Sequence, residues 1–393
     1  MSIEKNTGYL VRILRSTAHD EPAPDFPQDI DVDEFLNFCR LHKLLNVVYI
    51  TIGDKLPENK QQELTEAYNK SLFISAAQQY YIEAVEDAFS KNGIDYLILK
   101  GKELSSLYPS EDMRQSADFD IYIGKEACKT AKPIMESIGF NVVEYSDISD
   151  EHDEYIADST AFCELHKVLI QDNHPWREEC NKIPQRLVFS DEGEHCLKMR
   201  SEDFYLYNLA HAAKHMKLSG IGIRAFFDQW LIYKKMGDDF DWDYLNEALF
   251  RANLYEFDKN ARALYLYWFE GREPDNPALA NKMAEYVAKS GWVGTYEQFN
   301  ATKAAENSGI TRSKLVAKIM MCFKILSSPY ESMVLRYPIL KKHKWLTPFC
   351  RIHRGIMAVI RRRDLIKSVT SEIDSADIDF GKDIVKFKSS IGL

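Results

Sequence analysis

The sequence contains no long uncharged hydrophobic run. Its beginning, MSIEKNTGYLVRILRSTAHDEPAPDF, lacks the apolar stretch of a signal peptide. Nowhere do roughly 18 apolar residues, the length needed to cross a bilayer, follow one another without a charge. We therefore expect no transmembrane segment and a cytoplasmic location.

Cysteine is scarce and shows no pattern. The seven cysteines include no Cys-x-x-Cys pair, and their number is odd. Neither a disulfide framework nor a structural zinc site is therefore expected. Most of these thiols should be small buried side chains in a reducing compartment. They are Cys39, Cys128, Cys163, Cys180, Cys196, Cys322 and Cys350.

The composition is that of a globular protein, but its charge is unevenly distributed. Hydrophobic residues make up 45% and charged residues 28% of the 393 residues, which excludes a largely disordered or fibrous chain and leaves room for two or three domains. Residues 311–367 hold fourteen Lys and Arg against two acids, a charge of +12, so the net charge of −10 leaves −22 for the remainder. The sequence predicts a basic C-terminal region on an acidic body.

Hydrophobic spacing predicts helices in the first quarter of the chain and again after residue 200. Apolar residues recur at three- and four-residue intervals over 30–92, and Asn92-Gly93 is a typical helix end. A further helix is expected over SEDFYLYNLAHAAKHMKL, with Ser201 as its N-terminal cap. The helices that follow are expected over 222–236, 241–252, 256–271 and 276–289.

A short strand-rich segment separates the two helical regions. IDYLIL (94–99) predicts a strand that ends in a turn at Lys100-Gly101 and a helix. DFDIYI (118–123) predicts a second strand, followed by a helix, the strand NVVEYS, a polar loop and the strand AFCELHKVLI. Because helices separate only some of these strands, the expected fold is α+β, with a small mixed sheet between an N-terminal helical segment and a larger C-terminal helical domain.

Four regions follow from this pattern. They are an N-terminal helical region (1–92), an α/β core (93–200), a helical domain that closes the cleft (201–310) and a basic helical region (311–393). Within the last, residues 341–363 interleave basic with apolar side chains. This stretch is suited to contacting nucleic acid or an anionic membrane, but the alternation favours a packed amphipathic helix that neutralises the acidic body.

Three carboxylates give the strongest chemical signal. Asp118 and Asp120 are two residues apart on a predicted strand, so both project to one face, and Glu164 on another strand is placed to join them. Clustered acids repel one another unless a cation neutralises them. The sequence therefore predicts that Asp118, Asp120 and Glu164 bind Mg²⁺, or Mn²⁺ in its place.

The Asp-x-Asp pattern also occurs in other enzyme classes. Haloacid-type phosphatases normally have Thr or Val two places further on, where this chain has Tyr122. Glycosyltransferases use the pair to hold the metal of a nucleotide sugar, but they need an α/β nucleotide domain upstream, and residues 30–92 are predicted to be helical. The strand, turn and helix around Lys100-Gly101 favour a different class.

The run LILKGKELSSLYPSEDMRQSADFDIYI, followed later by ELH, resembles the polymerase-β-like nucleotidyltransferase superfamily, and within it the uncharacterised nucleotidyltransferase family 5. The resemblance spans roughly residues 30–290. It rests on Leu-Lys-Gly, an Arg before Asp-x-Asp, Glu-Leu-His, and a helical His-x-x-x-His followed by Arg-x-x-x-Asp. These motifs fall on Lys100, Gly101, Arg114, Asp118, Asp120, Glu164, His166, His211, His215, Arg224 and Asp228.

This resemblance implies transfer of a nucleoside monophosphate from an NTP, such as ATP, to a hydroxyl or phosphate of an acceptor, with release of pyrophosphate. The acceptor is a small molecule, an RNA or a protein. Asp118, Asp120 and Glu164 are then the catalytic residues. The residues expected to contact the nucleotide are Lys100, Gly101, Lys102, Arg114, Ser116, His211, Lys214, His215, Arg224 and Asp228. One departure is the turn, where the superfamily usually has Gly-Gly or Gly-Ser and this chain has Gly-Lys.

Several of these residues have alternative roles. His211 and His215 are spaced to bind zinc, to pack beside the active site or to contact phosphate, and the metalloprotease motif is absent because no Glu follows His211. Arg224 and Asp228 either form an intrahelical ion pair or shape the cleft. His166 is expected to support a ligand or to be a satisfied strand histidine.

Two other functions remain open at this point. One is a nucleotide-binding or assembly module that has lost turnover, which the altered turn supports and the three acids oppose. The other is a toxin-like transferase that acts on tRNA or a protein side chain, and the basic C-terminal region suits a tRNA acceptor.

Overall fold

The computed structural model describes residues 2–116, 118–144, 152–158, 161–170, 174–191, 193–292, 294–295, 298–299, 302, 343–350 and 378–393. The chain forms two compact units. The first comprises Met1–Val293 with Ile391–Leu393, and the second comprises Gly294–Ser390. The three carboxylates predicted to bind metal, Asp118, Asp120 and Glu164, all lie in the first unit.

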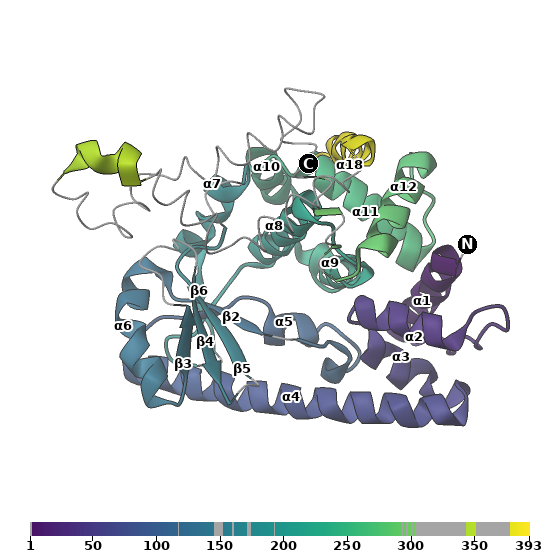
Figure 1. The fold of residues 1–393 in the computed structure, drawn as a ribbon, viewed down its shortest axis with the longest axis horizontal. Coiled ribbons are helices and arrows are strands. Elements are labelled where there is room, and N and C mark those ends of the chain that lie inside the picture. The colour runs from purple at the N-terminus through teal and green to yellow at the C-terminus, as the bar shows by residue number, and fades with distance from the viewer. Residues whose placement is uncertain are drawn as a thin grey trace. The chain divides into compact units, whose positions relative to one another are not determined.

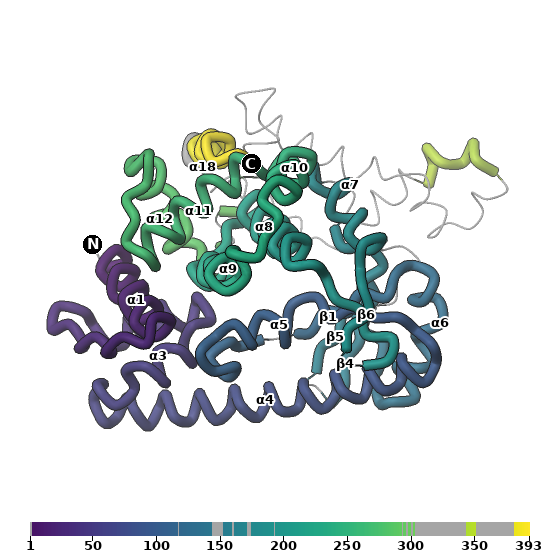
Figure 2. Tube along the Cα trace, turned by 180° about the vertical axis from the view of Figure 1, so that it is seen from behind, coloured from purple at the N-terminus to yellow at the C-terminus, as the bar shows by residue number. Residues whose placement is uncertain are grey.

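The N-terminal part of the first unit is helical. Its helices are α1 (Ser2–Ala18), α2 (Val32–Leu41), α3 (Leu45–Ile52) and α4 (Glu58–Lys91). At 34 residues, α4 is about 51 Å long at 1.5 Å per residue, and it runs along both the other N-terminal helices and the sheet (Figures 1 and 2). As predicted, Asn92 caps its C-terminal end and is followed by Gly93 with φ +66°. This one helix links the N-terminal helices to the sheet.

The sheet is small and mixed, which confirms the predicted α+β fold. Among its described strands only β2 and β5 run parallel, and the other neighbours are antiparallel. In spatial order the strands are β1 (Leu97–Ile98), β2 (Phe119–Tyr122), β5 (Ala161–His166), β4 (His152–Ala157) and β3 (Asn141–Glu144).

The prediction of a polar loop between the last two strands expected from the sequence is wrong, because β4 (His152–Ala157) lies there. Its residues alternate between the two faces, but one inward position is Asp153, which is 1% exposed. The Asp153 carboxylate accepts a hydrogen bond from Lys167 Nζ at 2.7 Å. A buried ion pair thus takes the place of the apolar residue by which such a strand is usually predicted.

Helices cover one face of the sheet. Phe119 and Ile121 of β2 join a buried cluster with side chains of α4 and of α6 (Gly124–Ser137). Because strand residues alternate, Asp120 and its neighbours in register project to the opposite face. The sheet therefore separates an apolar core from a polar surface.

The helices after residue 200 follow the prediction closely, but their first cap does not. Because the helix already begins at Ser201, the N-cap is Arg200, which makes no side-chain capping bond. Glu202 and Asp203 supply the negative charge of the first turn. These helices are α8 (Ser201–Leu218), α9 (Ile223–Met236), α10 (Trp242–Arg251), α11 (Tyr255–Glu270) and α12 (Pro277–Ser290).

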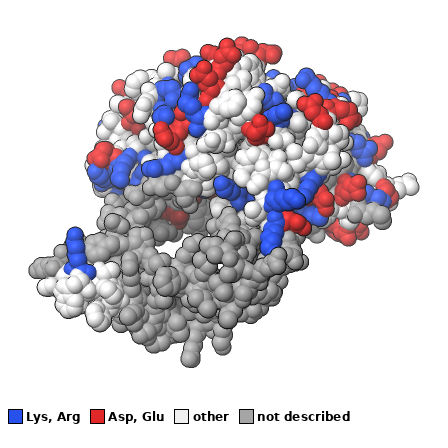
Figure 3. Space-filling view, turned by 90° about the horizontal axis from the view of Figure 1, so that it is seen from above, with Lys and Arg blue, Asp and Glu red and all other residues white. Residues whose placement is uncertain are grey.

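The described part of the first unit also contains several short elements. They are α5 (Gly101–Ser105), α7 (Arg177–Cys180), and the hairpin of β6 (Val188–Phe189) and β7 (Leu197–Lys198). Figure 3 shows acidic and basic side chains interspersed over the described part of one face.

The second unit is described only in part. It contains α18 (Ile378–Ser390), whose Lys388 Nζ donates a hydrogen bond to Thr302 Oγ1 at 3.0 Å. Of the predicted basic segment 311–367, all but 343–350 lies outside the described residues. In that short piece Trp345 and Phe349 are 69% and 63% exposed. A nucleic-acid or membrane contact through 341–363 stays a prediction.

The cysteines and the hydrophobic character of the helices agree with what the sequence lacks. Cys39, Cys128, Cys163, Cys180 and Cys196 are buried thiols, as predicted. In the part of the chain that the structure describes, no helix combines the length and the apolar character needed to span a membrane.

Close packing at Gly222 gives a first prediction. A Cβ there would lie 2.5 Å from the Gly291 carbonyl oxygen and 2.5 Å from His42 Nδ1, which accepts the Ile223 amide at 3.2 Å. We expect Gly222→Ala to lower the free energy of unfolding by about 1–3 kcal/mol because of this overlap. Gly8→Ala, with nothing within 4 Å of the new Cβ, should not destabilise. Equal urea midpoints for the two variants would contradict the prediction.

Candidate active site

Three carboxylates meet on the polar face of the sheet. Asp120 of β2 stands beside Glu164 of β5 in the parallel register, and Asp118 lies one residue before β2. Each offers one oxygen, and these oxygens lie within 4.8 Å of one another. Oxygen-only donors at this spacing suit a hard divalent cation such as Mg²⁺. The structure thus brings together the three acids that strand alternation had placed on neighbouring strands.

Burial and neighbouring charges shift the pKa values of these carboxylates in opposite directions. Burial raises the pKa of Asp118, and the charges of Asp120 and Glu164 raise it further. Burial also opposes ionisation of Asp120, but His166 and Lys100 outweigh it and lower the pKa. Lys100 Nζ lies 3.8 Å from Asp120 Oδ2, and burial lowers the lysine pKa to about 8. Lys100 and His166 thus stabilise the ionised acids in part, and a bound divalent ion would relieve the remaining repulsion among the three carboxylates.

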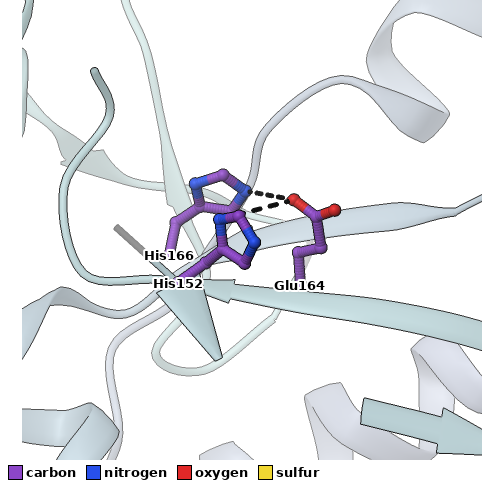
Figure 4. A group of neighbouring side chains, drawn as sticks. All are labelled: His152, Glu164 and His166. Carbon is purple, nitrogen blue, oxygen red and sulfur yellow. Dashed lines mark ion pairs between the residues drawn. The ribbon is translucent and has the colours of Figure 1, made fainter. Parts of the chain in front are cut away.

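Two histidines flank Glu164. His166 Nε2 lies 3.3 Å from Glu164 Oε2 and 3.6 Å from Asp120 Oδ1. Burial alone would lower the His166 pKa, but these carboxylates raise it to about 9. His152 of β4 directs Nδ1 to within 3.7 Å of Glu164 Oε2 (Figure 4). His152 is missing from the predicted site, since only the pairing of β4 with β5 reveals it.

The carboxylates line a pocket of about 310 Å³ between the sheet and the helices α8 and α9. This volume is at the lower end of the range for small-molecule sites. Of the predicted nucleotide contacts, only Lys102 is absent from the lining, and its side chain is exposed on α5. The predicted residues in the lining are Lys100, Gly101, Arg114, Ser116, Asp118, Asp120, Glu164, His211, Lys214, His215, Arg224 and Asp228.

Arg224 and Asp228 hold the loop that leads to Asp118. Asp228 accepts hydrogen bonds from Arg114 Nε and Nη2 at 3.0 and 3.2 Å and from the Tyr108 hydroxyl at 2.7 Å. Arg224 Nη1 donates to the Gln115 carbonyl at 2.5 Å. Both helix side chains therefore reach across to the loop, and these contacts take the place of the intrahelical ion pair that the spacing allowed.

The same loop is anchored from the N-terminal helices. The Gln115 side chain donates to Asn46 of α3 at 2.9 Å and to Ser71 of α4 at 3.2 Å. Ser116 Oγ, expected to contact the nucleotide, donates to the Asp118 carbonyl at 2.7 Å. Asn46 and Ser71 carry no local sequence signal, because they act through tertiary contact.

His211 and His215 of α8 face one another with their Nε2 atoms 3.3 Å apart. Burial lowers the pKa of His215 to about 4 and that of His211 well below its usual value, and the charge of Lys100 adds to both shifts. Both rings are therefore neutral at pH 7. Among the described residues, no group of three metal-ligand atoms includes either histidine, so the structure lends no support to the zinc alternative.

Aromatic rings hold the cationic side of the pocket. Lys100 Nζ lies 5.5 Å from the centroid of the Tyr207 ring. Arg224 Cζ lies 5.3 Å and Lys43 Nζ 5.1 Å from the centroid of the Trp292 ring. Such cation–π contacts hold positive charge in place where it is partly removed from water.

The comparisons with known proteins agree with this arrangement. A family model described as an uncharacterised nucleotidyltransferase matches residues 28–270, a span that contains every residue of the carboxylate cluster and of the loop before it. No curated protein and no solved structure gives a significant match. Because the matched span is well over half of the chain, the protein belongs to this family of nucleotidyltransferases.

Proposed function

We propose that the protein transfers a nucleoside monophosphate from an NTP, such as ATP, to a hydroxyl or phosphate of an acceptor and releases pyrophosphate. The observation that carries the proposal is the meeting of three carboxylates with buried cationic side chains in one pocket. Family membership supports the same class of reaction. The acceptor is a small molecule, an RNA or a protein.

Asp118, Asp120 and Glu164 would hold Mg²⁺, with Mn²⁺ as a substitute. When bound, the metal supplies positive charge to the phosphate oxygens and brings the attacking oxygen close to phosphorus. The donor set fits this task, since all three ligand atoms are carboxylate oxygens within 4.8 Å of one another.

The cationic side chains on the pocket wall are suited to the triphosphate. Lys100 is 15% exposed and stands at the turn where α5 begins, so its ammonium is fixed beside the acids. Lys214 lines the same pocket. Arg114 is bound to Asp228, and its role is to order the loop before Asp118. Lys100 and Lys214 thus bind phosphate, while Arg114 and Arg224 position the acids.

In the proposed reaction an acceptor oxygen forms a bond to the α-phosphorus. The bond from that phosphorus to the bridging oxygen breaks, and pyrophosphate leaves with the electron pair. A hydroxyl acceptor must also lose its proton. Glu164 is placed to accept it, because its carboxylate lines the pocket and is 30% exposed there.

Incubation of the full chain with each labelled NTP and Mg²⁺ tests this function. The reactions are run with and without total RNA, protein and cell metabolites, and pyrophosphate and labelled products are measured. The proposal expects pyrophosphate release with at least one NTP and its loss in Asp118→Ala. Nucleotide binding without any product, and no difference between Asp118→Ala and the wild type, would instead indicate a binding module.

Lys100→Gln gives a second test at the same site. Removal of the buried ammonium should raise the KM for NTP by about tenfold to a hundredfold, since a charged hydrogen bond contributes about 1.5–3 kcal/mol. Lys91→Gln is the matched control, because that lysine is 71% exposed on α4. Equal steady-state constants for both variants would remove Lys100 from the phosphate site.

A further inference from the structure

A second set of ligand atoms lies beside the carboxylate cluster. In the antiparallel register His152 stands opposite His166, and Glu154 stands opposite Glu164. All four positions project to the same face of the sheet. His152, Glu164 and His166 each offer one ligand atom, and these atoms lie within 4.8 Å of one another. Figure 4 shows both imidazoles directed toward the Glu164 carboxylate.

His166 is enclosed without a hydrogen bond. Its side chain is 9% exposed, and neither ring nitrogen has a hydrogen-bond partner among the residues that the structure describes. Nε2 nevertheless lies 3.3 Å from Glu164 Oε2. The contacts of Nε2 to Glu164 and, at 3.6 Å, to Asp120 Oδ1 are ion pairs without hydrogen-bond geometry, and a divalent ion bound at Nε2 of the neutral ring would replace them.

The orientation of His152 is that of a metal ligand. Its Nδ1 lies 3.7 Å from Glu164 Oε2, while Nε2 lies 3.3 Å from Glu154 Oε1 on the other side of the ring. Histidines that bind metal commonly donate their second ring N–H to a carboxylate, which fixes the tautomer and the direction of the ring. Glu154 is therefore a positioning residue that directs Nδ1 to the site.

We propose that His152, His166 and Glu164 bind a divalent transition-metal ion of the Zn²⁺ class. Two imidazole nitrogens and one carboxylate oxygen suit such an ion, whereas Mg²⁺ prefers oxygen ligands alone. Glu164 belongs to both ligand sets, so its two oxygens can connect this site to the one at Asp118 and Asp120. The proposal concerns metal binding and does not depend on nucleotidyl transfer.

Co²⁺, whose visible absorption reports its ligands, tests the site in the full chain. Metal-free protein is titrated with Co²⁺ in excess Mg²⁺, and stoichiometry is measured by equilibrium dialysis. The wild type should bind one Co²⁺ with a spectrum typical of nitrogen ligation. His152→Gln should weaken Co²⁺ binding at least about tenfold and change the spectrum. Asp118→Asn, which alters only the oxygen site, should retain both.

His195→Asn is the matched control. His195 pairs with Asp95 at 2.6 Å outside the pocket and has φ +67°, a conformation that Asn tolerates. This variant should titrate as the wild type does. If His152→Gln fails to fold by circular dichroism, Glu154→Gln replaces it, with a smaller loss of affinity and a changed spectrum expected.

Two outcomes would overturn the proposal. One is Co²⁺ binding without nitrogen ligation. The other is binding that Asp118→Asn abolishes and the histidine variant leaves unchanged, which assigns all of the metal to the carboxylates. Because metal binding is the readout, neither outcome is produced by an absence of nucleotidyl transfer.

Discussion

Asp120→Asn is expected to slow pyrophosphate release by about three orders of magnitude, equivalent to about 4 kcal/mol of transition-state stabilisation. Asp120 is the central acid, since it stands beside Glu164 in register and next to Lys100 Nζ at 3.8 Å. Its amide is a weaker metal ligand and leaves the Lys100 charge without its counter-ion. Initial rates with saturating NTP and Mg²⁺ measure the effect.

Asp87→Asn is the matched control for this variant. Asp87 is 62% exposed on α4 and pairs with Lys91 at 2.6 Å, so the same chemical change falls outside the pocket. It should leave the rate unchanged. A rate for Asp120→Asn within about tenfold of the wild type, a difference of 1.4 kcal/mol or less, would show that Asp120 does not act in the transition state.

Arg114→Met is expected to lower the free energy of unfolding by about 3 kcal/mol. The Arg114 guanidinium is 6% exposed and donates to both carboxylate oxygens of Asp228. Without it, the Asp228 carboxylate stays buried, with the Tyr108 hydroxyl and the nearby charge of Arg224 to stabilise it. Because Arg224 compensates in part, the expected loss lies at the lower end for a broken buried pair. Urea denaturation followed by circular dichroism measures it.

Two further variants serve as comparisons for Arg114→Met. Lys91→Met removes an exposed partner of Asp87 and should cost less than about 1 kcal/mol. Arg114→Met with Asp228→Asn leaves no uncompensated carboxylate and should recover part of the loss. Equal midpoints for Arg114→Met and Lys91→Met would contradict the buried-pair argument.

Most helices and the β2 strand could be predicted, because each buries an apolar face with a regular period. The strand β4 could not, since its inward position 153 is an aspartate that becomes acceptable only when Lys167 pairs with it. The prediction of Ser201 as the N-cap of α8 was wrong by one residue. A one-residue shift in the helix start makes Arg200 the cap instead.

Some residues of the candidate site could likewise be predicted from the sequence, and others could not. Asp118, Asp120 and Glu164 could be placed on one face because strand alternation is local. His152 required knowledge of which strand pairs with β5. Spacing made an ion pair the simplest expectation for Arg224 with Asp228, but buried contacts to the loop before Asp118 replace it. Local rules thus found the acids, and only tertiary structure shows how they are positioned.

The parallel pairing of β2 with β5 has a consequence for how activity is acquired during folding. Parallel strands cannot be joined by a tight turn, and here α6, β3 and β4 all lie between them in the chain. Asp120 and Glu164 therefore meet only through a non-local contact, of the kind that forms slowly. In a refolding chain these acids come close enough to repel one another only when β2 pairs with β5. Activity should therefore return no earlier than this pairing.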